Sequence, residues 1–279
     1  MNTEQRVCRD FIDKNCKRGD NCKFSHPTDV CRHFWKHGDC KFKEECKYKH
    51  VHSVGKKEKR KNTETWIPKL DPCDIRIVMD LSTDKCKQTI TSRDVLLVPN
   101  LFSRHRSGEI YFFLEEEIKK CKEKIPGVEK KWHGTVGIEG THTILDDRRK
   151  WKELVPTFCE IVSTIQSFFN MRVEATRLNI YDTTADFKPF HHDSSAVNID
   201  KAKIQNFTVA VSFGATRDAA FEHAKTKTTI CCPQKDGQIY AFSKDTNIIW
   251  RHGILAEKEV RKEGRISIIL WGWIDGMID

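Results

Sequence analysis

Two short repeats of cysteine and histidine constrain the first 50 residues of the chain more tightly than any other feature. Each repeat has the order Cys, Cys, Cys, His, with 7, 5 and 3 intervening residues in the first and 8, 5 and 3 in the second. The eight residues are Cys8, Cys16, Cys22, His26, Cys31, Cys40, Cys46 and His50. Three thiolates and one imidazole complete a tetrahedral shell for Zn²⁺ with no open position, as in structural zinc sites. Neither repeat has enough apolar residues for a core, so we predict that two zinc ions hold the two folds.

The repeats resemble tandem CCCH-type zinc fingers, a family whose members commonly bind single-stranded RNA. Four aromatic residues occupy matching places: Phe11 and Phe34 follow the first cysteine, and Phe24 and Tyr48 precede the histidine. Bases stack on such rings while lysine and arginine follow the backbone, which makes all four candidate nucleic-acid contacts. We expect one ring of each finger to pack beside the zinc instead.

The positive charge of the chain is concentrated at this end. Residues 1–62 carry 17 Lys or Arg against 9 Asp or Glu, whereas the remainder carries 32 against 31. Such asymmetry is typical of a module that binds a polyanion, although a solubilising basic tail has the same composition. We predict a finger unit over 1–52, a basic flexible linker over 53–70 and a globular domain over 71–279.

Several protein classes do not fit the sequence. No apolar run approaches the ~18 residues that a membrane helix requires, and the chain opens without a secretion leader. The remaining six cysteines show no disulfide framework, which favours reduced thiols. We therefore expect a monomer inside the cell, in the nucleus or cytoplasm, with no membrane partner.

A second candidate metal site ends the stretch from Arg177 to Asp193. On a strand, alternate side chains share a face, so His191 and Asp193 point together. A third ligand is available in His252, which lies in an apolar segment where a buried histidine needs a partner or a metal. Two histidines and one carboxylate with open positions opposite suit non-haem iron(II) and oxygen chemistry. A solvated turn is the alternative interpretation of His191–Asp193 alone.

Three further residues indicate an anion beside this site. Arg265 begins an apolar strand-like segment, and a buried arginine needs a negatively charged partner. Asn179 and Tyr181 share one face of the run that leads into His191. A dicarboxylate cosubstrate would supply the anion.

The rest of the chain after residue 71 alternates strand and helix patterns. Two helices are predicted, over 104–124 and 151–170, the second with an apolar stripe that packs under a sheet. Short apolar segments separated by turn residues predict a β-sandwich or barrel. They cover 74–81, 94–99, 207–213, 220–224, 228–233, 238–242, 248–254 and 265–274.

From about Asp94 to Trp273 the chain resembles the AlkB-like iron(II)/2-oxoglutarate dioxygenases. The family pattern Asn-x-Tyr followed by His-x-Asp matches Asn179, Tyr181, His191 and Asp193, and the family's His-Gly-Ile matches His252–Ile254. Ser212, Gly214 and Arg217 loosely echo a further family motif. The closing Arg-x-Asn/Ser-x-x-x-Arg matches at Arg265 and Ser267 but has Trp271 in place of its last arginine.

The resemblance implies an α+β fold, with a double-stranded β-helix (jelly roll) and flanking helices after the two fingers. It implies that His191, Asp193 and His252 bind Fe(II), that Arg265 and Tyr181 hold the distal carboxylate of 2-oxoglutarate, and that Asn179 helps hold the nearer one. With O2 as cosubstrate, such an enzyme demethylates RNA or single-stranded DNA, and Trp132 is a candidate to stack on a flipped base.

Because Trp271 stands in place of the second arginine of the family pattern, three outcomes stay open: another cation replaces that arginine, with Arg251 and Arg217 as candidates, or cosubstrate binding is weak, or catalysis is lost. Two other functions stay open: a protein hydroxylase of the same iron class, and an RNA-binding regulator with a vestigial oxygenase domain.

Overall fold

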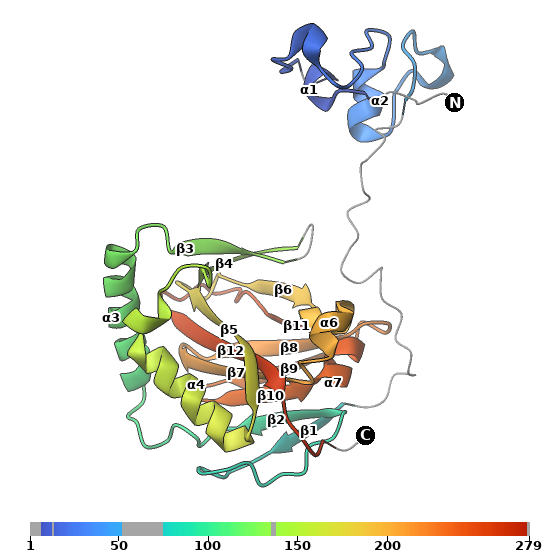
Figure 1. Ribbon diagram of the computed structural model, residues 1–279. Helices are drawn as coiled ribbons and strands as arrows, with labels where there is room; N and C mark the ends of the chain where they lie inside the picture. The colour runs from blue at the N-terminus through green and yellow to red at the C-terminus, as the bar shows by residue number, and fades with distance from the viewer. Residues whose placement is uncertain (1–6, 13, 52–74, 135–137, 278–279) are drawn as a thin grey trace. The chain divides into compact units, whose positions relative to one another are not determined.

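The computed structural model describes residues 7–12, 14–51, 75–134 and 138–277, in two compact units on either side of residues 52–74 (Figure 1). The whole of the predicted linker, 53–70, lies outside the described residues. Among the described residues, no helix has the length and apolar character to cross a membrane.

The first unit contains the two repeats, and each repeat begins with a short helix. Its helical elements are α1 (Arg9–Ile12), η1 (Gly19–Asn21), α2 (Arg32–His37) and η2 (Lys43–Glu45). Isolated bridges join Val7 to Ser25 and Val30 to Lys49, so each repeat closes on itself. The buried apolar cluster consists of Ile12, Val30 and Trp35. A cluster of three residues is too small to stabilise a fold alone, which agrees with a fold held by metal.

The second unit is built on two β-sheets. The large sheet has the strand order β1-β2-β10-β7-β12-β5-β4-β3, and the small sheet has the order β6-β11-β8-β9. Apart from the parallel pair β1 and β2, all pairings are antiparallel. The strands are β1 (Arg76–Met79), β2 (Asp94–Val98), β3 (Glu129–His133), β4 (Glu139–Leu145), β5 (Arg172–Tyr181), β6 (Lys188–His191), β7 (Phe207–Gly214), β8 (Arg217–His223), β9 (Thr229–Gln234), β10 (Ile239–Ser243), β11 (Trp250–Ile254) and β12 (Arg265–Trp273).

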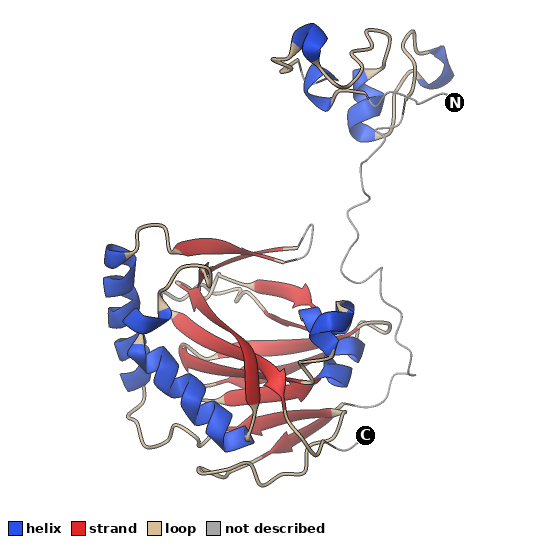
Figure 2. Ribbon diagram, in the orientation of Figure 1, coloured by secondary structure: helices blue, strands red, loops and turns tan. Residues whose placement is uncertain are grey.

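The two sheets and two long helices form three layers (Figure 2). The helices α3 (Glu109–Lys124) and α4 (Pro156–Phe169) pack on the large sheet around a core that includes Leu114, Ile165 and Ile268. A second apolar cluster joins the two sheets and includes Tyr240 of the large sheet and Phe221 of the small one. The predicted jelly roll with flanking helices is confirmed.

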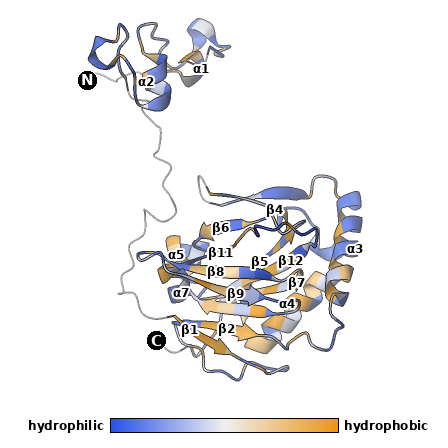
Figure 3. Cartoon of the chain, turned by 180° about the vertical axis from the view of Figure 1, so that it is seen from behind, coloured by the Kyte–Doolittle hydropathy of each residue, from blue (hydrophilic) through white to orange (hydrophobic). Residues whose placement is uncertain are grey.

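The amphipathic patterns explain the helix positions. On α3 the buried residues Ile110, Leu114 and Ile118 recur at intervals of four and face the sheet. Much of the helix is hydrophilic in Figure 3, although Phe112 and Phe113 are exposed. The predicted start at 104 is too early, because Gly108 adopts a left-handed conformation with φ of 80° and the helix begins at Glu109. α4 begins with Pro156 at its first position, where proline is favoured.

A short helix replaces the start of one predicted strand. The predicted strand over 248–254 was wrong at its start: Ile248 and Ile249 belong to α7 (Lys244–Ile249), and β11 begins at Trp250. Ser243 causes this, since its Oγ accepts a hydrogen bond of 3.0 Å from the Thr246 amide and caps the helix. Two further short helices, α5 (Ser194–Val197) and α6 (Ile199–Ala202), follow β6.

Candidate metal centre and nucleic-acid interface

The structure brings His191, Asp193 and His252 together. His191 ends β6, Asp193 lies two residues later as the residue that precedes α5, and His252 lies on β11 directly opposite His191 in the antiparallel register. The Nε2 atoms of His191 and His252 lie 3.7 and 3.5 Å from the two carboxylate oxygens of Asp193. All three residues are buried, and one ligand atom from each lies within 4.8 Å of the others.

The protonation states of His191 and Asp193 fit the binding of a divalent metal ion. His191 Nδ1 lies 2.9 Å from the Pro189 carbonyl oxygen, which assigns the proton to Nδ1 and leaves Nε2 as a buried atom without a partner. Burial and the charge of Lys188 lower the pKa of His191 to about 3, so the ring is neutral. Burial opposes ionisation of Asp193, but His252 and His191 hold the pKa of its carboxyl well below the usual range. Neutral imidazoles and an ionised carboxylate are the forms that bind metal.

Neighbouring residues fix the orientation of the Asp193 carboxylate. Trp271 Nε1 donates a hydrogen bond of 2.8 Å to Oδ2, and Thr208 Oγ1 donates one of 3.3 Å to the same oxygen. The Asp193 amide donates to Asn247 Oδ1 at 2.9 Å. Partners of this kind hold a ligand in the rotamer that the metal requires. Trp271, the residue at the last position of the closing motif, therefore contacts a candidate metal ligand directly.

The three candidate metal ligands line a cavity that is also lined by Arg265, whose guanidinium has no ion-pair partner among the described residues. The residue is 1% exposed, and its Nη2 donates to Ser212 Oγ at 2.5 Å, while Nε and Nη1 have no partner. The guanidinium also stacks over the Tyr181 ring, 4.9 Å from the ring centroid. A buried guanidinium with two free donors fits a planar carboxylate, which accepts hydrogen bonds at both oxygens.

Asn179 and Tyr181 line this cavity as well. Asn179 donates a hydrogen bond of 3.2 Å to Ser267 Oγ, and its Oδ1 is buried without a partner. The His142 ring stacks on Tyr181 with centroids 4.7 Å apart and an interplanar angle of 9°. These aromatic side chains come from β4 and β5, which pair in the large sheet.

Trp132 lies over the metal ligands instead of facing solvent. Its side chain is 5% exposed, stacks on His142 with centroids 5.3 Å apart and meets His191 edge-on at 5.4 Å. In this arrangement both faces are too enclosed to receive a base. The sequence-based hypothesis that Trp132 stacks on a flipped base therefore requires β3 to move.

Neither cation suggested for the missing arginine is free to bind an anion. Arg217 donates from Nη2 to the carbonyl oxygens of Asp186 and Leu255, both at 2.6 Å. Arg251 forms an ion pair with Glu222. Sequence reasoning missed a third cation, Lys188, which lines the cavity with Arg265.

Both Cys-Cys-Cys-His sets converge as the spacing predicts. In each set, ligand atoms lie within 4.8 Å of one another, and the Nε2 atoms of His26 and His50 are buried without a partner. The sulfurs of Cys8 and Cys22 are 3.6 Å apart, and those of Cys31 and Cys40 are 3.8 Å apart, so they are not disulfide-bonded. These sets fit tetrahedral zinc.

The finger aromatics divide into two kinds. Phe11 stacks on the ring of His26 at 4.3 Å, and Phe34 stacks on His50 at 4.2 Å, both nearly parallel. One ring of each finger therefore packs against the candidate zinc ligand histidine. Phe24 and Tyr48 are 44% and 55% exposed and remain candidate base-stacking residues.

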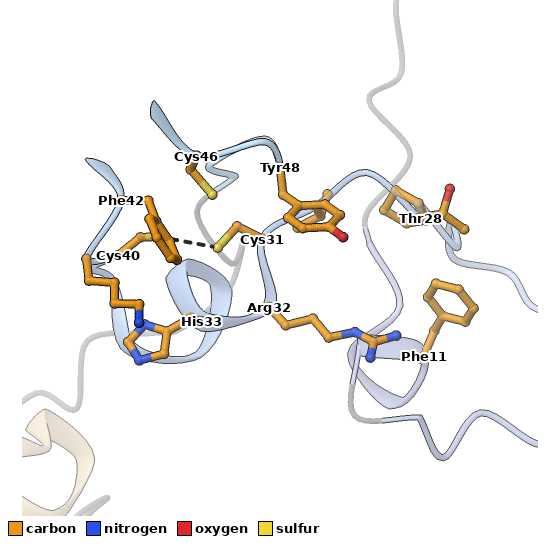
Figure 4. Close-up of a pocket in the computed structure, with 12 residues that line it drawn as sticks. Phe11, Thr28, Cys31, Arg32, His33, Cys40, Phe42, Cys46 and Tyr48 are labelled. Atoms are coloured by element: carbon orange, nitrogen blue, oxygen red, sulfur yellow. Dashed lines mark hydrogen bonds between the residues drawn. The ribbon is translucent and has the colours of Figure 1, made fainter. Parts of the chain in front are cut away.

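A groove of about 680 Å³ between the fingers offers a further ring that the sequence analysis missed, Phe42, which is 56% exposed (Figure 4). Tyr48 and Arg32 line the same groove, and the Lys41 ammonium lies 4.9 Å from the Phe42 ring centroid. Exposed rings beside cations are the arrangement that single-stranded nucleic acids contact.

Comparison with known proteins identifies both repeats. Residues 6–27 match a family described as CCCH-type zinc finger, and residues 31–50 match one described as RNA-binding, Nab2-type zinc finger. The prediction of tandem CCCH fingers is confirmed. No curated protein matches the chain.

Two solved structures illustrate the similarity of the chain to known folds. One is a prolyl hydroxylase from Trichoplax adhaerens in complex with a hypoxia inducible factor oxygen degradation domain peptide, with 12% identity, 65% of this chain and 84% of that chain covered and a TM-score of 0.43. The other is OsALKBH1, with 12% identity, coverage of 60% and 99% and a TM-score of 0.39.

Proposed function

We propose that the second unit is an Fe(II)- and 2-oxoglutarate-dependent oxygenase and that the fingers deliver RNA to it. One observation carries the proposal: a buried His-Asp-His set lies in the same cavity as a buried guanidinium with two unpaired donors. A His-Asp-His set alone, or a buried guanidinium alone, also occurs in proteins of other functions. Together they match the needs of a divalent metal and of a carboxylate cosubstrate.

The residues of this chain have separate tasks in the reaction. His191, Asp193 and His252 would hold iron(II), and Arg265 with Tyr181 would bind the distal carboxylate of 2-oxoglutarate. Iron(II) and 2-oxoglutarate, once bound there, would supply the activation of O2 for hydroxylation of a C–H bond, with 2-oxoglutarate converted to succinate and CO2. A hydroxylated N-methyl group is then lost from the base as formaldehyde. Trp132 and His142 limit access of water to the ligands, since both rings pack over the cavity.

The fingers supply substrate capture. Phe24, Phe42 and Tyr48 present exposed rings, and Arg32 and Lys41 add positive charge. Stacking on exposed rings contributes about 1–3 kcal/mol per base in single-strand binding. We therefore assign RNA, or single-stranded nucleic acid, as the substrate class.

The test is turnover on modified oligonucleotides. Iron-loaded full-length protein with 2-oxoglutarate and O2 should form succinate and formaldehyde with N-methylated single-stranded RNA. The paired variants Phe42→Ala and Tyr48→Ala should raise the KM for RNA while leaving kcat within about twofold, because the affected residues are far from the chemistry in sequence and bind substrate only. The proposal fails if iron-loaded protein forms no succinate with any nucleic acid or protein substrate.

Protein hydroxylation is a second candidate, and Trp132 favours it. Its enclosed ring provides no exposed base-stacking platform beside His191. A narrow target such as an amino-acid side chain enters more easily than a base. Mass spectrometry of proteins that co-purify with the enzyme, before and after turnover, distinguishes the two substrates by a gain of one oxygen atom.

A further inference from the structure

Lys188 is a buried cation without a carboxylate partner in the described part of the chain. It begins β6, is 7% exposed and lines the cavity that contains His191, Asp193 and Arg265. Its nearest described ring contact is Trp132, with Nζ 5.0 Å from the ring centroid. Burial of an unpaired ammonium lowers the stability of the fold by several kcal/mol through lost hydration. A bound anion would offset this cost.

An irregularity between β6 and β11 aims Lys188 into the cavity. Lys188 and His191 are three residues apart, and on a regular strand they would face opposite sides. However, His191 pairs with His252 while Lys188 pairs with Ile254, so two residues of β6 oppose Gly253 alone. Such a bulge rotates the strand and places both side chains on one face. Gly253 is required there, since a Cβ would lie 2.6 Å from the Lys188 carbonyl oxygen.

The charges that line the cavity are unbalanced without an anionic ligand. Asp193 is its single carboxylate among the described lining residues, against the cations Lys188 and Arg265. A divalent ion on the three ligands would increase the positive excess further. A dianion neutralises most of this excess, whereas a monoanion leaves one buried cation unpaired.

Lys188 and Arg265 serve different parts of the cavity. Arg265 contacts Ser212 and Tyr181, away from the metal ligands. The Lys188 Nζ lies 5.0 Å from the centroid of the Trp132 ring, and the centroid of that ring lies 5.4 Å from the centroid of the His191 ring, which places the ammonium on the metal-ligand side of the cavity. Provided that the proposed function holds, we propose that Lys188 pairs with the carboxylate nearest the metal, so that Lys188 and Arg265 bind the two ends of one dicarboxylate. Lys188 thereby supplies the charge absent at Trp271.

The test compares two ligands that differ only at the distal end. Full-length protein loaded with Mn(II) under nitrogen is titrated with 2-oxoglutarate or pyruvate in a calorimeter, so no turnover is involved. Lys188→Met should weaken the binding of both ligands by roughly 10- to 100-fold, and Lys188→Arg should weaken it less. Arg265→Met should weaken 2-oxoglutarate alone, because pyruvate has no distal carboxylate. The exposed Lys203→Met serves as the matched control and should change neither affinity.

Two measurements guard against a folding artefact. Mn(II) affinity reports an intact triad, and the melting temperature of ligand-free Lys188→Met should equal or exceed that of the wild type, because an unpaired buried charge is removed. The inference is overturned if Lys188→Met binds both acids like the wild type, or if it weakens 2-oxoglutarate but not pyruvate. If Mn(II)-loaded wild type binds neither acid, the proposed function itself fails.

Discussion

Trp271 shows how a single residue connects the core to the metal site. Its indole donates to Asp193 Oδ2 at 2.8 Å, so Trp271→Phe keeps the packing and removes one hydrogen bond to the ligand carboxylate. We expect Mn(II) affinity to fall roughly 10- to 100-fold, as for other groups that orient metal ligands. Isothermal titration measures this change.

Trp273→Phe is the matched control for this prediction, since its indole donates to Asp275 at 3.1 Å on the exposed end of the same strand. It should bind Mn(II) like the wild type. Equal Mn(II) affinities for Trp271→Phe and the wild type would show that this hydrogen bond does not orient the ligand.

The sequence predicted the metal ligands well, because cysteine and histidine at regular spacing have few roles other than metal binding. Spacing alone grouped the eight finger ligands, and the structure brings each set together. Lys188 could not be found in the same way, because period-two alternation places it on the face opposite His191. Lys188 lies on the same face as His191 because two residues of β6 oppose Gly253 alone, which forms a β-bulge. A bulge of this kind leaves no reliable signal in the sequence.

At the scale of elements, Asp94 anchors the edge of the large sheet. Its side chain is buried, accepts two hydrogen bonds from Arg76 at 2.6 and 2.8 Å and accepts the Thr91 amide at 2.8 Å. Arg76 lies on β1, whose one partner among the described strands is β2. Asp94→Asn should therefore lower the free energy of unfolding by about 2 kcal/mol at pH 7, as expected for hydrogen bonds to a charged group.

The stabilisation from Asp94 should depend on pH in a defined direction. Burial opposes its ionisation, but Arg76 and Thr91 keep the pKa of the Asp94 carboxyl below the usual value. A lowered folded-state pKa gives stability that is present above the unfolded pKa of about 3.9 and is lost as the pH falls towards the folded pKa. Urea titrations should show the difference between wild type and Asp94→Asn shrinking from pH 7 to pH 3. A difference that grows on acidification would contradict the assignment.

Strand order and element ends show the limit of sequence patterns. Apolar segments located most strands, yet Ile248 and Ile249 form a helix because the Ser243 cap, three residues before Thr246, starts a turn there. A short apolar run is found in buried helices and in buried strands alike, so it does not distinguish the two. Here the helix cap at Ser243 decides in favour of a helix.

At the scale of the whole molecule, the two units depend on different forces. The finger unit has three buried residues in its apolar cluster, Ile12, Val30 and Trp35, whereas the second unit has an extensive core. Removal of zinc should unfold the fingers and leave the thermal transition of the second unit unchanged. Two-dimensional NMR of the full chain before and after a zinc chelator checks this. Fingers that keep dispersed signals without zinc would refute it.

The central claim is that three side chains, remote in sequence, bind one iron ion beside a receptor for a diacid. Elemental analysis of anaerobically reconstituted protein tests it most directly. The account predicts one iron and two zinc ions per chain for the wild type, and two zinc ions without iron for Asp193→Ala. Iron retained at full stoichiometry by Asp193→Ala would contradict the account.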